Sequence, residues 1–84
     1  MHTKNDIEKL VRKKIAKILC VDRIDIDESD EIIRDLKILS DDVSFDFIPD
    51  LEQEIQVRGT QEDWGAVYTV GNAIDLLFEL QFRL

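Results

Sequence analysis

The sequence predicts an all-α fold, a small helical bundle in which residues 1–84 form a single domain. Apolar residues recur at spacings of three and four over three separate segments, and no segment shows the strong apolar and polar alternation of a half-buried strand. The chain has 84 residues, of which 44% are hydrophobic and 36% charged. That is enough apolar material for one core, and the chain is too short for two.

The first expected helix spans Asp6–Val21. Its apolar stripe consists of Ile7, Leu10, Val11, Ile15, Ile18 and Leu19. Thr3, Asn5 or Asp6 can cap its start, because each side chain can accept a hydrogen bond from an early backbone N–H. Cys20 lies at the end of this helix on a mostly apolar face, so we expect it to be a small core residue and not a reactive thiol.

Residues 22–36 are expected to form a long loop with a short turn, which covers one end of the bundle. A second helix follows from Ser40, whose hydroxyl can cap it, and acids in its first turn suit the helix dipole. Its expected inward face is Phe45, Ile48, Leu51 and Ile55. An acidic stripe on another face recurs every four residues and consists of Asp42, Asp46, Asp50 and Glu54.

Pro49 interrupts the pattern of the second helix. In a helix interior a proline removes one hydrogen bond and clashes with the carbonyl four residues earlier, at a cost of roughly 3 kcal/mol. We therefore expect a bend in this helix or a late start near Ser44.

The last third of the chain begins with a break at Gly59 and Thr60. Residues 62–67 are expected to form a short helix or an irregular turn, in which Trp64 either anchors the loop on the core or contacts a partner. Thr69 is a good N-cap for a last helix. The stripe of that helix is Val70, Ala73, Ile74, Leu77 and Leu80, with Phe78 and Phe82 beside it.

Charge and composition exclude several functions. A formal net charge of -8 repels nucleic acid and anionic membranes, and no apolar stretch reaches the roughly 20 residues that span a bilayer. One cysteine cannot form an internal disulfide, which suits the reducing cytoplasm. We expect a soluble, cytoplasmic protein that is a monomer. A domain this small does not readily enclose a catalytic cavity, and His2 has no neighbouring nucleophile motif. We assign no catalytic residue and expect a binding or carrier module.

A metal site is not expected either. In the acidic loop Asp25, Asp27 and Ser29 alternate as in a calcium-binding EF-hand loop. That loop needs glycine at its sixth position and a bidentate glutamate at its twelfth, where this chain has Asp30 and Leu36.

Four short segments carry a resemblance to a known family. They are Leu19-Cys20-Val21, Asp35-Leu36, Leu51-Glu52-Gln53-Glu54-Ile55 and Tyr68-Thr69-Val70-Gly71-Asn72-Ala73-Ile74-Asp75. They resemble four segments of acyl carrier proteins, in this order. These segments are the "LGV" end of the first helix, the Asp-Leu before the attachment motif, the "LEEEF" end of the second helix and the "TTVGDAID" start of the last helix. The resemblance covers nearly the whole chain. It implies a four-helix bundle with three long helices, one short helix and a long loop after the first.

The resemblance also implies a function. Acyl carrier proteins tether an acyl group as a thioester on a 4'-phosphopantetheine arm and serve fatty acid or polyketide biosynthesis. Their partners, such as a phosphopantetheinyl transferase and acyl-transferring enzymes, have basic surfaces that dock on the acidic second helix. By this resemblance the docking residues are Asp41, Asp42, Asp46, Asp50 and Glu54.

The resemblance allows more than one position for the arm. Counting forward from Asp35 places Ser40 at the attachment position, whereas counting backward from Leu51 places Asp41 there, so one residue is inserted between the two anchors. The family's motif is Asp-Ser-Leu, but Ser40 lies between Leu39 and Asp41. Ser40 is therefore either the attachment site or a plain helix cap, and Ser44 is a third option.

Two further departures from the family are Pro49 and Trp64, which lie where a carrier houses its acyl chain. They allow a narrowed or absent acyl pocket. The alternative function is a non-covalent, acidic interaction or inhibitor protein on the same scaffold, without a prosthetic group, that binds a basic partner. An enzyme would need convergent polar residues in a pocket, which the sequence does not show.

Overall fold

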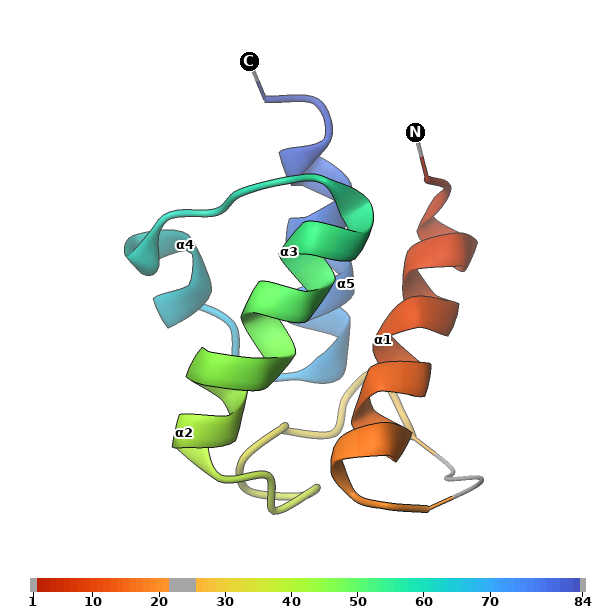
Figure 1. Cartoon of the computed structure of the whole chain (residues 1–84), viewed down its shortest axis with the longest axis vertical. Coiled ribbons are helices and arrows are strands. Elements are labelled where there is room, and N and C mark those ends of the chain that lie inside the picture. The colour runs from red at the N-terminus through yellow and green to blue at the C-terminus, as the bar shows by residue number, and fades with distance from the viewer. Residues whose placement is uncertain (1, 22–25, 84) are drawn as a thin grey trace.

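Three long helical segments and one short one make up the fold of the computed structural model, which describes residues 2–21 and 26–83 (Figure 1). Helix α1 spans Lys4–Ile18, α4 spans Gln61–Gly65 and α5 spans Val70–Leu80. The second long helix consists of three consecutive pieces: α2 (Ser40–Asp42), the π-helix η1 (Val43–Phe47) and α3 (Ile48–Ile55). The predicted all-α, four-helix architecture is confirmed for the described part of the chain.

The core lies where α1, α3 and α5 meet. Each contributes residues at helical spacing: Ile7, Val11 and Ile15 from α1, Leu51 and Ile55 from α3, and Val70, Ala73, Ile74 and Leu77 from α5, joined by Phe47 from η1. The predicted stripes of the first and last helices are confirmed. Such an apolar stripe stabilises each helix mainly by packing against the other two.

The segment after α1 closes the end of the bundle at which α5 begins (Figure 1). The N–H of Ile32 donates to the carbonyl of Tyr68 at 2.9 Å, and the N–H of Val70 donates to the carbonyl of Asp30 at 2.9 Å. Ile26, Ile32 and Ile38 of this segment are buried in the core. Residues 22–25 of the predicted loop lie outside the described residues.

Reciprocal capping boxes begin three helices. The hydroxyls of Thr3, Thr60 and Thr69 accept hydrogen bonds from the backbone N–H three residues on, and the side chains of Asp6, Asp63 and Asn72 accept from the capping threonines' backbone N–H. Each box satisfies backbone donors that have no partner within the helix. The structure thus selects Thr3 among the predicted caps of the first helix, and confirms Thr69.

The end of α1 departs from prediction. The helix ends at Ile18 and not at Val21, and Cys20 adopts a left-handed backbone with φ 58°. Cys20 is exposed, so the prediction that it belongs to the core is wrong. Once the chain has left the helix, the periodicity that placed Cys20 on the apolar face no longer applies.

Pro49 occupies the second position of α3, and α3 begins directly after the π-helix. A proline lacks the backbone N–H and so removes one hydrogen bond from a helix, and here it does so next to the π-turn, where the α-helical hydrogen-bond pattern is already interrupted. The second helix starts at Ser40 and continues through Pro49, so the predicted late start near Ser44 is wrong. A π-turn, Val43–Phe47, precedes Pro49; the predicted bend stays a prediction.

Only one of the two phenylalanines before Pro49 faces inward. Phe47 is fully buried, whereas Phe45 is 81% exposed, so the prediction that Phe45 lines the core is wrong. Residues two apart are about 200° apart around a helix, and only one of the two can face the core. Phe47 does so because it lies four residues before Leu51, with which it forms one stripe.

No helix in the described part of the chain is both long and apolar enough to cross a membrane.

Candidate functional site

Ser40 is the first residue of the second helix, and its side chain is exposed. The N-cap position belongs to Leu39, and no side chain caps this start. The prediction that Ser40 caps the second helix is therefore wrong. Its hydroxyl lies at the surface, at the junction of the long loop and the helix. Ser44, the third option for the arm, is an exposed residue inside the π-helix.

The π-turn lies between Asp35 and Leu51. These are the two residues from which the forward and backward counts give attachment positions that differ by one residue. In it, the N–H of Ile48 donates to the carbonyl of Val43, five residues earlier. An α-helical hydrogen bond spans four residues, so this turn holds one residue more. Between Ser40 and Leu51 the helix therefore holds one residue more than a regular α-helix would, and Leu51 lies in the core stripe.

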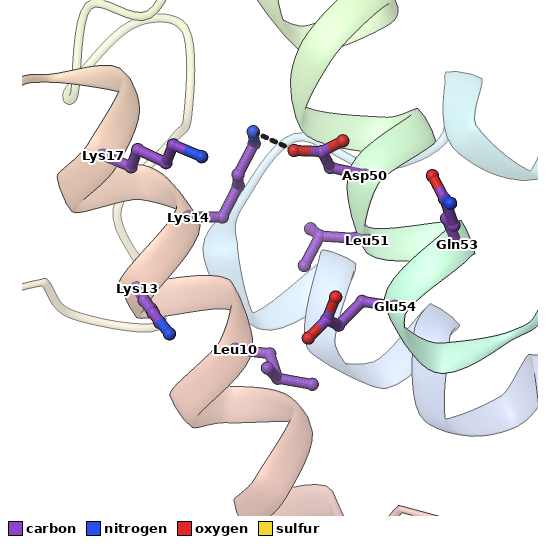
Figure 2. A pocket seen from close by; sticks show the side chains of 8 residues that line it. All are labelled: Leu10, Lys13, Lys14, Lys17, Asp50, Leu51, Gln53 and Glu54. Atoms are coloured by element: carbon purple, nitrogen blue, oxygen red, sulfur yellow. Dashed lines mark hydrogen bonds and ion pairs between the residues drawn. The ribbon is translucent and has the colours of Figure 1, made fainter.

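Lys14 of α1 gathers two acids of the predicted acidic stripe. Its Nζ donates to Oδ1 of Asp46 at 2.7 Å, and Lys14 itself is only 8% exposed. The same Nζ donates to Oδ2 of Asp50 (Figure 2). Burial lowers the pKa of Lys14, but the two carboxylates outweigh it, so that the pKa is raised. The Lys14 hydrogen bond, followed by its charge, lowers the pKa of Asp50.

Sequence reasoning missed this cluster. Lys14 lies three residues after Val11 and four before Ile18, so it occupies a position of the apolar stripe of α1. That spacing was the available signal, because a lysine on an apolar stripe buries its stem and directs its ammonium to an acid.

The five predicted docking acids therefore divide into two groups. Asp46 and Asp50 bind Lys14, while Asp41, Asp42 and Glu54 are exposed and form no ion pair with any residue of the described ranges. Asp41, Asp42 and Glu54 are therefore available to a partner without loss of an ion pair within the described residues.

A groove of about 560 Å³ runs between α1 and α3 (Figure 2). It is lined by Leu10, Lys13, Lys14, Lys17, Asp50, Leu51, Gln53 and Glu54. Lysines form one wall and acids the other, and no nucleophile with a neighbouring base lies in it. Its chemistry is that of a charged surface.

A second, mostly apolar crevice measures about 60 Å³. It is lined by Glu31, Ile32, Ile33, Val43, Phe47, Ile48, Trp64, Val67 and Tyr68. Val43 follows Ser40 by three residues, so the two lie on the same side of the helix. Ligand pockets are typically about 300–1,000 Å³, so this crevice is narrow.

Trp64 is fixed where it lines the crevice. Its indole N–H donates to Oε2 of Glu52 at 3.2 Å, and the N–H of Gly59 donates to the same oxygen at 2.6 Å. The ring packs against the core, which confirms the prediction that Trp64 anchors its segment.

Within residues 2–21 and 26–83, no group of three or more His, Cys, Asp or Glu residues is arranged to hold a metal ion. Asp25, part of the calcium pattern considered above, lies outside the described residues. No protein-family model and no curated protein matches this chain.

Proposed function

We propose that the protein is a carrier of the acyl-carrier type, with a 4'-phosphopantetheine arm on the hydroxyl of Ser40 and an acyl cargo held as a thioester. The single observation that supports this most is the π-turn between Ser40 and Leu51, because such a turn would accommodate the one residue by which the two counts differ if Ser40 carries the arm.

The surroundings of Ser40 are compatible with the arm. The hydroxyl is exposed and is not engaged as a cap. A phosphodiester there would be repelled by Asp41 and Asp42 by about 1 kcal/mol, an effect partly offset by the helix N-terminus, which favours anions. Neither effect prevents attachment. The arm would form when the Ser40 oxygen attacks a phosphorus atom of coenzyme A, loses its proton, and displaces adenosine 3',5'-bisphosphate.

The narrow crevice bears on the cargo. At about 60 Å³ it has room for only a small apolar group beside Phe47 and Trp64. The geometry therefore favours a short cargo or one that stays outside the core. A place in fatty acid or polyketide biosynthesis, in the cytoplasm, follows from the carrier proposal.

The test is the intact mass of the protein after incubation with coenzyme A and a phosphopantetheinyl transferase of broad specificity. A gain of one arm that is absent in Ser40→Ala and retained in Ser44→Ala supports the proposal. No gain in the wild-type chain, or a gain lost only in Ser44→Ala, contradicts it.

A second candidate function is a non-covalent interaction protein on the same scaffold. The observation that favours it is that Asp41 follows Ser40 where the family motif has leucine, while Asp41 and Asp42 remain exposed. In this case no arm is attached by any transferase, and the acids bind a basic partner directly.

A further inference from the structure

Positions 41, 45, 49 and 53 form the outward ridge of the second helix. Asp41, Phe45, Pro49 and Gln53 are all exposed and recur every four residues, so they follow one side of the helix. The predicted acidic stripe is one residue out of step with this ridge, and its middle members, Asp46 and Asp50, turn toward Lys14 of α1. The outward ridge is therefore not a continuous acidic stripe.

Phe45 is the centre of this ridge. At 81% exposed it is the most exposed of the large hydrophobic side chains in the described residues. Pro49 continues the apolar surface one turn after Phe45. Asp41 and Asp42 lie about one turn before Phe45. Aromatic residues that insert into a partner's pocket commonly supply most of the binding energy of an interface, whereas the charged rim mainly steers the encounter.

We infer that the outward ridge is a docking surface on which Phe45 is the anchor and Asp41 and Asp42 are the steering charges. The partner it fits is a protein with an apolar pocket bordered by Lys or Arg side chains. Charge complementarity supports this occupant, because the two acids have no ion-pair partner among the residues described and the chain carries a net charge of -8. The inference rests on the proposed function, because that function places a partner enzyme on the second helix.

The spacing to the core stripe presents the anchor. Phe47 lies four residues before Leu51 and enters the core, so Phe45, two residues earlier, faces solvent. Phe45 makes no contribution to the core, so its removal tests docking without loss of the fold.

The test measures binding of a phosphopantetheinyl transferase of broad specificity in the absence of coenzyme A. The Ser40→Ala chain is used, because it cannot accept an arm and so separates docking from attachment. Binding is followed by titration calorimetry, and circular dichroism confirms that every variant is folded. The docking variants are Phe45→Ala and Asp41→Asn, each added to Ser40→Ala. Their matched controls are Phe82→Ala, which removes a 55% exposed phenylalanine, and Glu62→Gln, which neutralises an exposed acid of α4.

We expect Phe45→Ala to weaken binding at least tenfold at any salt concentration, and Asp41→Asn to weaken it about threefold at low salt only. The two controls should change binding less than twofold. Equal binding of Phe45→Ala and its parent, or no binding of the parent, overturns the inference. If the parent binds through Phe45 while the wild-type chain gains no arm, the docking surface stands and the carrier function fails.

Discussion

Nζ of Lys14 donates a 2.7 Å hydrogen bond to Oδ1 of Asp46, which joins the first helix to the π-turn of the second. The same ammonium also binds Asp50, one turn further along. A buried charge is costly unless it is paired, and here two half-exposed carboxylates compensate it. The cluster thus fixes how the helix that carries Ser40 and Phe45 lies against α1.

Replacing Lys14 with alanine should destabilise the fold by about 1–3 kcal/mol, since both its buried stem and its ion pairs are lost. Lys14→Met keeps most of the stem and should cost less. Urea denaturation measures both values. Lys13→Ala, an exposed neighbour, is the control and should stay within about 0.5 kcal/mol. Equal stability of Lys14→Ala and the control would show that the cluster contributes nothing.

Stability should fall in acid. A hydrogen bond from Lys14 lowers the pKa of Asp50, and hydrogen bonds led by that from the backbone N–H of Thr60 lower the pKa of Asp63. Because these pKa values are lower in the folded than in the unfolded chain, the stabilisation is present above the usual value of 3.8 and is lost as pH falls through the lowered values. Urea denaturation at about pH 5 and about pH 2.5 measures the loss. Asp50→Asn should reduce it, and an unchanged pH dependence in this variant would contradict the assignment.

Gly59→Ala should loosen the Trp64 anchor. A Cβ at this position would lie 2.8 Å from the indole nitrogen of Trp64 and 3.2 Å from a methyl carbon of Leu80. The ring would have to move, at a cost of about 1–3 kcal/mol. Denaturation followed by tryptophan fluorescence reports both the stability and the environment of the ring. Gly65→Ala is the matched control, because a Cβ there meets no atom within 4 Å. A loss equal to that of the control would mean that close packing at Gly59 is unimportant.

Capping distinguishes Thr69 from Ser40. Thr69 accepts a 3.0 Å hydrogen bond from the N–H of Asn72, so Thr69→Ala should cost about 1 kcal/mol. Ser40 caps no helix, so Ser40→Ala should change the free energy of unfolding by less than about 0.5 kcal/mol. Thermal and urea denaturation compare the two variants. A loss of about 1 kcal/mol in Ser40→Ala would restore the capping role that the structure does not show.

The sequence predicts the helices better than the site because periodicity reports burial along an uninterrupted helix. The stripes of α1 and α5 are regular, and their core residues follow from spacing alone. Phe45 and Phe47 are two residues apart, and with Pro49 and an inserted residue nearby, spacing cannot say which of them faces inward. The partners of Lys14 lie 32 and 36 residues away along the chain, a contact that only the packing of α1 against the second helix reveals.

Deleting one residue tests the role of the π-turn. Removal of Ser44 would leave Ile48 four residues after Val43, so the hydrogen bond between them would become an α-helical one. The second helix would then be regular, and the core residues on both sides would keep their places. The experiment is made in a Pro49→Ala background, because a proline in a regular helix interior costs about 3 kcal/mol. We expect the free energy of unfolding to stay within about 1 kcal/mol of the background protein.

Deleting Lys13 in the same background is the matched control. It also removes one exposed residue, but from a regular α-helix, where it rotates Ile7 and Val11 by about 100° relative to Ile15. Urea denaturation should show a loss on the order of 3 kcal/mol or more, because part of the core stripe turns to solvent. If the Ser44 deletion costs as much as the Lys13 deletion, the π-turn does not hold an additional residue, and the register that places Ser40 at the attachment position loses its physical basis.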